Sequence, residues 1–270
     1  MAEALKEAPA VTDWGPFSLK GRNALITGAA MGIGHGIAKR FAEAGANVVI
    51  ADISPAIESV ATELDGGRAK GIVFDVSDAT AAAGAVQRVV DEFGSIDILV
   101  NNAGIYPMSP FLDMSPEFFD RVIGINLRGS VFLCKAAVAQ MVKQGKGGKI
   151  VNVASIDALI PSAPGLNAYD TSKGGVLMFT KSLALEVAPF NITVNAIAPG
   201  GIITEGASKP MMGMNPQQLE AMTKEFVKQI PVGRMGAPDD IATVAVFLAS
   251  PAAGYMTGTL TVVDGGRLLK

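Results

Sequence analysis

A tyrosine and a lysine four residues apart, Tyr169 and Lys173, are the pair in this chain best suited to acid–base chemistry. If their segment is helical, positions i and i+4 share one face, with Cβ atoms about 5–6 Å apart. A free phenol titrates near about 10, and a nearby ammonium would move the pKa of Tyr169 toward the pH at which acid–base catalysis works best. The pair is equally consistent with one face of an amphipathic helix, so other segments must distinguish the two interpretations.

Short β-branched runs alternate with longer alanine-rich segments of helical period. This alternation predicts repeated βαβ units and a parallel sheet buried on both faces. Strands are predicted at 23–27, 47–51, 69–74, 96–100, 149–154, 192–198 and 259–263. Helices are predicted at 33–44, 55–64, 78–93, 115–144 (broken in two near 124–129), 168–189 and 238–249. The unbroken pattern indicates one doubly wound α/β domain over 18–270, preceded by a loose, flexible N-terminal arm over 1–17.

The composition argues against several classes of partner. The chain has 270 residues, of which 49% are apolar and 17% charged, so it can bury a large core. A net charge of −3 with scattered Lys and Arg offers no basic surface for nucleic acid. Its apolar runs of about five residues are far shorter than the roughly 20 that span a bilayer. The first 17 residues hold no apolar signal segment, so we expect a cytoplasmic protein that binds neither nucleic acid nor membrane.

The single cysteine and the single histidine are not expected to do chemistry. Cys134 lies in an apolar run and has no second cysteine to pair with, which fits a core residue in a reducing compartment. His35 falls in another motif, so it cannot be assumed to activate that thiol. We interpret His35 as a surface residue or one that lies near a phosphate.

A glycine-rich turn, residues 28–34, follows the first predicted strand and begins the first predicted helix. Glycines allow a tight turn and a close approach to a pyrophosphate, whose charge then meets free N–H groups at the helix N-terminus. The spacing is G-x-x-x-G-x-G rather than the usual dinucleotide fingerprint. A purely structural turn would explain this motif equally well if it stood alone.

Asp52 lies at the end of the second predicted strand, 24 residues after Gly28. An acidic residue at this place hydrogen-bonds the adenosine ribose of a dinucleotide. A 2′-phosphate a few ångströms away would be repelled by a few kcal/mol at an effective dielectric of about 20, or about 10² in affinity. We therefore expect NAD rather than NADP, unless a cation on the first predicted helix captures the phosphate. The candidates for that cation are His35, Lys39 and Arg40.

The segment from Gly200 to Arg234 departs from the alternation of strands and helices. It is rich in methionine, glycine and proline and lies between two predicted strand–helix units. Insertions beyond the carboxyl end of a strand commonly carry substrate loops, and methionine suits an adaptable lid. We expect a substrate loop over about 202–230. The alternative is a helical packing insertion without ligand contacts.

With these motifs in order, the chain from about Leu19 to Gly266 resembles the short-chain dehydrogenase/reductase (SDR) family. Residues 27–34 resemble its TGxxxGIG, residues 75–76 the pair that borders the adenine, and residues 101–104 its NNAG. Residues 229–234 and 263–266 resemble the branch of 3-oxoacyl-carrier-protein reductases and of sugar and secondary-alcohol dehydrogenases. The resemblance implies a Rossmann-like fold with a seven-stranded parallel sheet in the order 3-2-1-4-5-6-7, helices on both faces, and a homotetramer.

The resemblance also implies a catalytic tetrad, Asn126, Ser155, Tyr169 and Lys173, and hydride transfer between a nicotinamide and a carbon that bears oxygen. Tyr169 would be the general acid in ketone reduction and the general base in alcohol oxidation. Ser155 would hold the substrate oxygen, and Lys173 would bind the nicotinamide ribose and favour the phenolate. Asn126 would steady the helix and a water that links Lys173 to solvent. Taken singly, Ser155 is equally consistent with a turn cap and Asn126 with a loop amide.

The NAD contacts that the resemblance implies follow the glycine turn and the ends of the strands. In the turn after the sixth predicted strand, the backbone of Ile202 and the hydroxyl of Thr204 would hold the carboxamide. No metal site is expected. The full cofactor set is Gly28, Met31, Gly32, Ile33, Gly34, Asp52, Ile53, Asp75, Val76, Asn102, Ala103, Gly104, Tyr169, Lys173, Pro199, Gly200, Ile202 and Thr204.

Substrate contacts are expected at Ser155, Asp157 and Tyr169. The carboxylate of Asp157 could accept hydrogen bonds from substrate hydroxyls, and it could equally face solvent. The interval between Ser155 and Tyr169 is slightly longer than is common in the family, which alters the pocket wall and limits what relatives say about the substrate.

The leading hypothesis is an NAD-dependent oxidoreductase that interconverts a secondary alcohol and a ketone on a small hydroxylated compound: a sugar, sugar acid, polyol or diol. One alternative is a 3-oxoacyl thioester reductase, which would need a basic docking patch near the pocket mouth. The other is a non-catalytic nucleotide-binding regulator, which would usually lack one member of the tetrad.

Overall fold

Seven parallel strands form one sheet in the order β3-β2-β1-β4-β5-β6-β7, which confirms the predicted topology. The computed structural model describes residues 14–64, 68–208, 215 and 223–270. Every residue of β1 is buried, as expected for a parallel strand covered on both faces. The strands are β1 (Asn23–Thr27), β2 (Asn47–Asp52), β3 (Ala69–Val73), β4 (Ile98–Asn101), β5 (Gly148–Val153), β6 (Ile192–Pro199) and β7 (Leu260–Val263).

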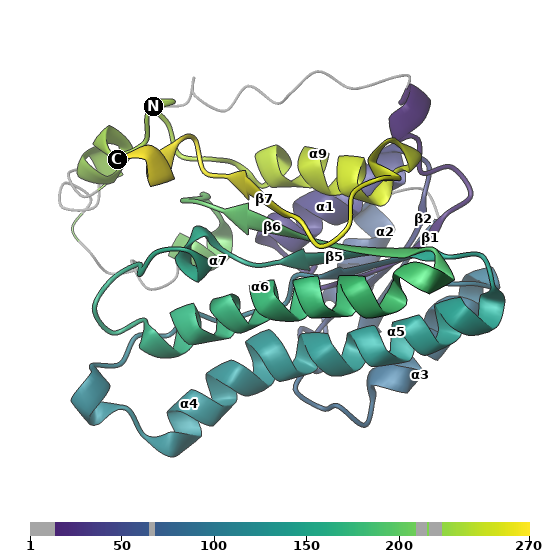
Figure 1. Cartoon of the computed structure of the whole chain (residues 1–270), viewed down its shortest axis with the longest axis horizontal. Coiled ribbons are helices and arrows are strands. Elements are labelled where there is room, and N and C mark those ends of the chain that lie inside the picture. The colour runs from purple at the N-terminus through teal and green to yellow at the C-terminus, as the bar shows by residue number, and fades with distance from the viewer. Residues whose placement is uncertain (1–13, 65–67, 209–214, 216–222) are drawn as a thin grey trace.

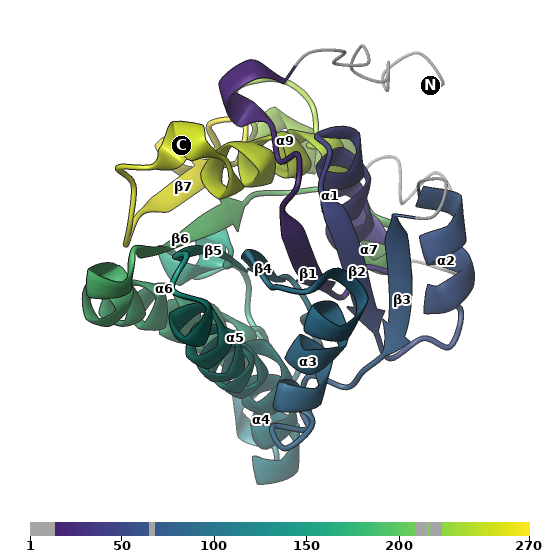
Figure 2. The same cartoon turned by 90° about the vertical axis from the view of Figure 1, so that its right-hand side faces the viewer.

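Helices cover both faces of the sheet. On one face lie α1 (Gly32–Glu43), α2 (Ile57–Leu64) and α9 (Pro238–Ala249), and on the other α3 (Ala82–Phe93), α5 (Ser130–Gln144) and α6 (Asn167–Val187), as Figures 1 and 2 show. Successive side chains of a strand point to opposite faces. Accordingly, Ala24 and Ile26 pack with α1 and α9, whereas Leu25 packs with α3 and α5.

The predicted break near 124–129 is wrong. Helix α4 (Pro116–Ile123) continues through a π-helical segment, Gly124–Gly129, directly into α5. A π turn accommodates extra residues without ending the helix, and such turns occur frequently at functional sites. Over Pro116–Gln144 the combined helix is long and apolar enough to cross a membrane by length and composition. Its α5 part packs along α3 and the sheet, where Leu133, Cys134 and Met141 are buried.

Some predicted boundaries shift because side chains form local turns. The helix predicted over 78–93 begins only at Ala82, because Asp75 accepts from the backbone of Ser77, and Asp78 from that of Thr80. Aspartates that bond the backbone two residues later favour turns over helix. The prediction that Cys134 is a core residue is confirmed: its side chain is buried, and burial raises the pKa of the thiol to about 12.

The two irregular segments predicted from the sequence lie partly outside the described residues. Of the N-terminal arm over 1–17, the structure describes Trp14 and a 3₁₀ turn, Gly15–Phe17. Trp14 packs against the core formed by α1, α9 and the sheet, and the exposed ring of Phe17 lies 6.1 Å from that of Phe247. Of the segment over 202–230, residues 209–214 and 216–222 are not described. Its described parts include the short helix α7 (Glu205–Ser208) and a helical stretch over 223–228.

Candidate active site

The carboxyl ends of the strands bring the sequence-predicted residues to one edge of the sheet. Gly28 follows β1, Asp52 ends β2, Asn102 follows β4, Ser155 follows β5 and Gly200 follows β6. In open parallel sheets, ligands bind outside these carboxyl ends, where the strand order reverses. Here that reversal lies between β1 and β4, so the glycine-rich turn and the NNAG segment lie side by side.

The glycine-rich turn is shaped by backbone contacts that leave no room for a side chain. Gly28 has a φ of +64°, and a Cβ there would lie 2.7 Å from the Cα of Ala103. A Cβ on Gly34 would lie 2.3 Å from the carbonyl oxygen of Gly28 and 2.4 Å from Nδ2 of Asn102. That amide nitrogen donates to the carbonyl oxygens of Thr27 and Gly28, at 2.9 Å each. The turn is therefore fixed against the NNAG segment.

The N-terminus of α1 already binds an anionic group. The backbone N–H of Gly32, the first residue of α1, donates to Oε2 of Glu205 at 3.1 Å. The side chain of Thr204 covers the same glycine, since a Cβ on Gly32 would lie 3.2 Å from it. Free N–H groups and the helix dipole make such an end suited to phosphate. The rigid turn and this amide together fit the pyrophosphate of a dinucleotide.

Asp52 holds the backbone around the glycine-rich turn. Its Oδ2 accepts from the N–H of Ala30 at 3.1 Å, and its Oδ1 accepts from the N–H of Ser54 at 3.0 Å. Of the three cations considered as phosphate partners, Arg40 is engaged elsewhere: its guanidinium forms a bidentate pair with Asp239 and also bonds Glu43. A carboxylate therefore borders the turn, while the guanidinium of Arg40 is occupied by two acids.

The predicted adenine-side residues lie at the same edge but differ in their surroundings. Asp75 is exposed and accepts from both the backbone N–H and the hydroxyl of Ser77, at 2.8 Å each. The Val76 carbonyl faces Gly129, where a Cβ would approach it to 2.6 Å. Met31 and Ile53 expose 38% and 70% of their surface. Exposed apolar side chains of this kind suit contact with an aromatic base.

The sequence prediction that Tyr169 and Lys173 share a helical face agrees with the structure. Both lie in the first turns of α6, with Nζ of Lys173 5.7 Å from the centre of the Tyr169 ring. Lys173 is only 5% exposed, and its Nζ donates to the carbonyl oxygen of Val153 at 2.8 Å. The lysine is thereby tied to the end of β5, directly before the segment that holds Ser155.

Asn126 lies in the π-helical segment and joins two parts of the site. Its Oδ1 accepts from the N–H of Ile105 at 2.8 Å, and its Nδ2 donates to the Ile105 carbonyl at 2.8 Å and to the Ser172 hydroxyl at 3.0 Å. It is 1% exposed. The side chain thus links the segment after NNAG to α6. A Cβ on Gly104 would lie 3.3 Å from Asn126 Oδ1 and 3.6 Å from Lys173 Nζ, so the two groups border the same small space.

Ser155 both caps a turn and lies beside the phenol. Its hydroxyl donates to Oδ2 of Asp157 at 3.0 Å and accepts from the N–H of Asp157 at 3.2 Å, which caps the 3₁₀ turn Ile156–Ala158. The Ser155 hydroxyl also interacts with the phenol of Tyr169, and this interaction lowers the pKa of Tyr169. The ring of Tyr106 meets that of Tyr169 edge to face, with centroids 6.0 Å apart. Ser155, Asp157 and Tyr169 therefore border one space.

The expected lowering of the Tyr169 pKa is wrong for the protein without ligands. Burial raises the pKa of the phenol, and the neighbouring Asp157, Tyr106 and Asp170 raise it further. The physical reason is that the phenolate would be desolvated and would face two carboxylates. Lys173 lies under the ring and donates to a backbone carbonyl instead of the phenol oxygen.

Burial lowers the pKa of Lys173 from 10.5 to about 8, and this predicts a pH dependence of stability. Between these values the unfolded chain holds a proton that the folded chain has lost, so this group makes the free energy of unfolding rise with pH, by up to about 3 kcal/mol. Above about pH 9 the raised pKa of Cys134 acts in the opposite direction, because the unfolded thiol then ionises first, and above about pH 10 the raised pKa of Tyr169 does the same. Urea unfolding at pH 7 to 9 should therefore show the rise for wild type.

The Lys173→Met variant should lack this rise, because a thioether does not titrate. Lys181→Met, on the exposed side of the same helix, is the matched control and should keep it. An identical pH slope for wild type and Lys173→Met would contradict the buried ammonium described above.

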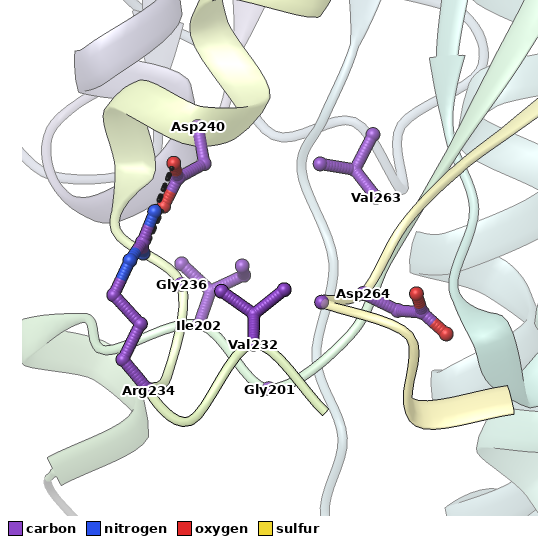
Figure 3. A pocket seen from close by; sticks show the side chains of 9 residues that line it. Gly201, Ile202, Val232, Arg234, Gly236, Asp240, Val263 and Asp264 are labelled. Carbon is purple, nitrogen blue, oxygen red and sulfur yellow. Dashed lines mark hydrogen bonds and ion pairs between the residues drawn. The ribbon is translucent and has the colours of Figure 1, made fainter. Parts of the chain in front are cut away.

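A cavity of about 130 Å³ lies beside the turn that follows β6. Figure 3 shows Arg234 and Asp240 paired at its edge, with two N–H···O contacts of 2.7 and 2.8 Å. Sites for ligands of drug size commonly measure about 300–1,000 Å³, so this cavity suits a few waters. The residues that line it stabilise the turn after β6, because Ile202 forms an isolated β-bridge with Gly236. In the described ranges, no group of three His, Cys, Asp or Glu could hold a metal.

Four residues at the site were not assigned a role from the sequence: Tyr106, Asp170, Ser172 and Glu205. Ser172 had a detectable signal, because it lies three residues after Tyr169 on the same predicted helix and so near the same face. Glu205 directly follows Thr204, but nothing in the sequence indicates that its carboxylate turns back to α1. The ring contact of Tyr106 depends on the path of the loop after β4, which local sequence does not specify.

Comparisons with known proteins agree with this geometry. A family model described as Enoyl-(Acyl carrier protein) reductase matches residues 28–267. Oxidoreductase UcpA of Escherichia coli K12 is 43% identical over 93% of this chain and 96% of the relative. Galactitol 2-dehydrogenase of Agrobacterium fabrum is 40% identical over 92% of this chain and 98% of the relative. A short-chain type dehydrogenase/reductase from Mycobacterium marinum superposes with a TM-score of 0.87 at 39% identity, over 94% of this chain and 98% of that one. The chain belongs to the short-chain dehydrogenase/reductase family and is an oxidoreductase that acts on CH–OH groups.

Proposed function

We propose that the protein is an NAD-dependent dehydrogenase that oxidises a secondary alcohol of a small polyhydroxylated compound to a ketone. The observation that carries this proposal is the meeting of Ser155, Tyr169 and Lys173 at the ends of β5 and α6, on the same sheet edge as the glycine-rich turn. A bound nicotinamide would supply the acceptor for the hydride. The remaining steps fall to side chains of this chain.

The proposed steps follow from the contacts of each side chain. Ser155 holds the substrate oxygen next to the phenol, a positioning role that contributes as much as proton transfer. Tyr169 takes the hydroxyl proton as general base. Lys173 provides the positive charge that the phenolate needs, and Asn126 keeps α6 aligned through its bond to Ser172. The raised pKa of Tyr169 means that the phenol holds its proton tightly, and the ammonium of Lys173 beside the ring is the positive charge that can offset this.

The proposed preference for NAD rests on Asp52. Its carboxylate lies against the glycine-rich turn, through Ala30, and its negative charge disfavours a 2′-phosphate. We expect kcat/KM with NAD to exceed that with NADP by about 10². In the Asp52→Asn variant the ratio of kcat/KM with NAD to kcat/KM with NADP should fall below about 10, mainly because kcat/KM with NADP rises.

Asp78→Asn is the matched control for that substitution, because Asp78 is an exposed carboxylate that also caps a turn. It should keep the wild-type cofactor ratio. A higher kcat/KM with NADP than with NAD in the wild-type protein would refute the role given to Asp52.

The alternative functions receive less support. A 3-oxoacyl thioester reductase was expected to carry a basic patch near the pocket mouth, but the charged groups that raise the Tyr169 pKa are the acids Asp157 and Asp170. A non-catalytic regulator was expected to lack a tetrad member. Here Asn126, Lys173 and Ser155 are all present and buried.

Purified protein with NAD or NADP and a substrate panel tests the proposed function. The panel contains polyols, sugars, sugar acids, diols and 3-oxoacyl thioesters, and the readout is absorbance at the NADH band. We expect NAD reduction with at least one polyhydroxylated compound. Turnover of the thioesters alone would favour the 3-oxoacyl thioester reductase. If no compound changes the absorbance at the NADH band, the proposed function is refuted.

We also propose that the protein assembles as a homotetramer, as the family resemblance implies, and that it acts in the cytoplasm. Helices α5 and α6 expose large apolar side chains, including Met178 at 64% and Leu185 at 83%, and such surfaces favour association. Sedimentation velocity should give a tetramer, and a monomer at micromolar concentration would contradict this.

A further inference from the structure

Carboxylates are prominent among the charged groups around Ser155 and Tyr169. Asp157 accepts from the Ser155 hydroxyl at 3.0 Å, so its carboxylate is the nearest charged neighbour of the group proposed to hold the substrate oxygen. The side chain is neither deeply buried nor fully exposed. It therefore borders the space that a substrate has to enter.

Asp170 supplies a second carboxylate that acts on Tyr169. It lies in the first turn of α6, next to Tyr169, and its Oδ2 accepts from the N–H of Ser162 at 3.4 Å. Its Oδ1 is buried and has no hydrogen-bond partner among the described residues. Ser162 also lowers the pKa of Asp157 through a side-chain hydrogen bond, so the loop between Ser155 and Tyr169 connects the two acids.

The two carboxylates act on each other and on the phenol. The charge of Asp170 raises the pKa of Asp157, and both acids raise the pKa of Tyr169. Lys173 is the cation that acts on Asp157, but it is buried and bonded to Val153. Asp157 and Asp170 therefore both contribute negative charge to the surroundings of Ser155 and Tyr169.

We propose that Asp157 and Asp170 determine substrate specificity by selecting an uncharged polyol or sugar and rejecting a sugar acid. The proposal rests on the proposed function and narrows its substrate class. A carboxylate acts only as a hydrogen-bond acceptor, which suits the hydroxyl donors of a polyol. An anionic substrate is repelled by both acids, and at an effective dielectric of about 20 each close like charge costs about 10-fold or more in affinity.

Because the Ser155 hydroxyl bonds Asp157, this hydroxyl alone lies between the carboxylate and the place proposed for the reacting substrate oxygen. If the substrate oxygen bonds Ser155, a hydroxyl on the adjacent carbon would be the nearest substrate donor for Asp157, whose carboxylate bonds the same serine. The favoured substrate is therefore a neutral compound with vicinal hydroxyls.

The test compares a hexitol with the corresponding hexonate, which differ by one terminal carboxylate. With NAD at fixed pH and ionic strength, wild-type kcat/KM should favour the hexitol at least about 10-fold. Asp157→Asn and Asp170→Asn should each reduce this ratio about 10-fold, mainly by improving the hexonate, and added salt should weaken the discrimination. Asp91→Asn, on α3 and bonded to Gln87, removes the same net charge and should leave the ratio unchanged.

A second readout does not require turnover. The thermal shift of the protein with NAD present should be larger with the hexitol than with the hexonate, and the two shifts should become equal in the Asp157→Asn, Asp170→Asn double variant. A wild-type preference for the hexonate, or a ratio unchanged in both aspartate variants, overturns the charge selection while the proposed function stands. If NAD is reduced with no compound of the panel, the proposed function fails and the thermal shifts decide the charge selection.

Discussion

Replacement of Tyr169 by phenylalanine should lower kcat/KM for alcohol oxidation about 10²–10⁴-fold, the usual contribution of general acid–base catalysis. The change removes one oxygen and keeps the ring, which packs edge to face on Tyr106. The fold should therefore persist. The measurement is the steady-state rate of NADH formation with the best substrate, together with the thermal unfolding midpoint.

The matched control is Tyr255→Phe, because Tyr255 is fully exposed and lies outside the site. It should retain wild-type activity. Because the phenol is assigned to proton transfer, the Tyr169→Phe variant should bind NAD with nearly unchanged affinity while kcat falls. Activity within about 10-fold of wild type would contradict the role of Tyr169 as general base.

Gly34→Ala should disrupt both the fold around the cofactor site and the affinity for NAD. The new Cβ would lie 2.3 Å from the Gly28 carbonyl oxygen and 2.4 Å from Asn102 Nδ2, so the backbone of the turn and the Asn102 side chain would have to shift. Overpacking costs about 1–3 kcal/mol, and loss of the part-buried Asn102 hydrogen bonds adds about 0.5–1.5 kcal/mol. A displaced turn should also weaken NAD binding about 10²-fold or more.

Gly84→Ala is the control for that substitution. Gly84 lies within α3, and a Cβ there meets nothing within 4 Å. Alanine at an open helical position should raise the stability by about 0.5–1 kcal/mol. Urea unfolding and calorimetric titration with NAD check both variants. A Gly34→Ala protein that is as stable as wild type and binds NAD equally well would refute the close contact between the turn and the NNAG segment.

Much of the fold was predictable because its signals are local and periodic. Buried parallel strands such as β1 and β2 appear as short apolar runs, and the strand order followed from the family resemblance. The continuous helix through Gly124–Gly129 was not predictable, because two glycines in six residues normally weaken a helix. Here a π turn absorbs them and places Asn126 toward Ile105 and Ser172.

The composition of the site was easier to predict than its electrostatics. The spacing of Tyr169 and Lys173 indicated a shared helical face, but the direction of the Tyr169 pKa depends on burial and on Asp157 and Asp170. Such effects arise from loops that meet only in the folded chain. The hydrogen bond from the Gly32 N–H, at the start of α1, to the Glu205 carboxylate is another example, because these two residues lie 173 positions apart in the chain.

The most direct test of the central claim follows the hydrogen itself. The protein is incubated with NAD and a polyol that carries deuterium on the carbinol carbon, and the mass of the reduced nicotinamide is measured. The account predicts one deuterium in the reduced product formed by wild type and almost no product from Tyr169→Phe. Reduced cofactor that lacks deuterium, or equal product from the Tyr169→Phe variant, would contradict direct transfer from a carbinol deprotonated by Tyr169.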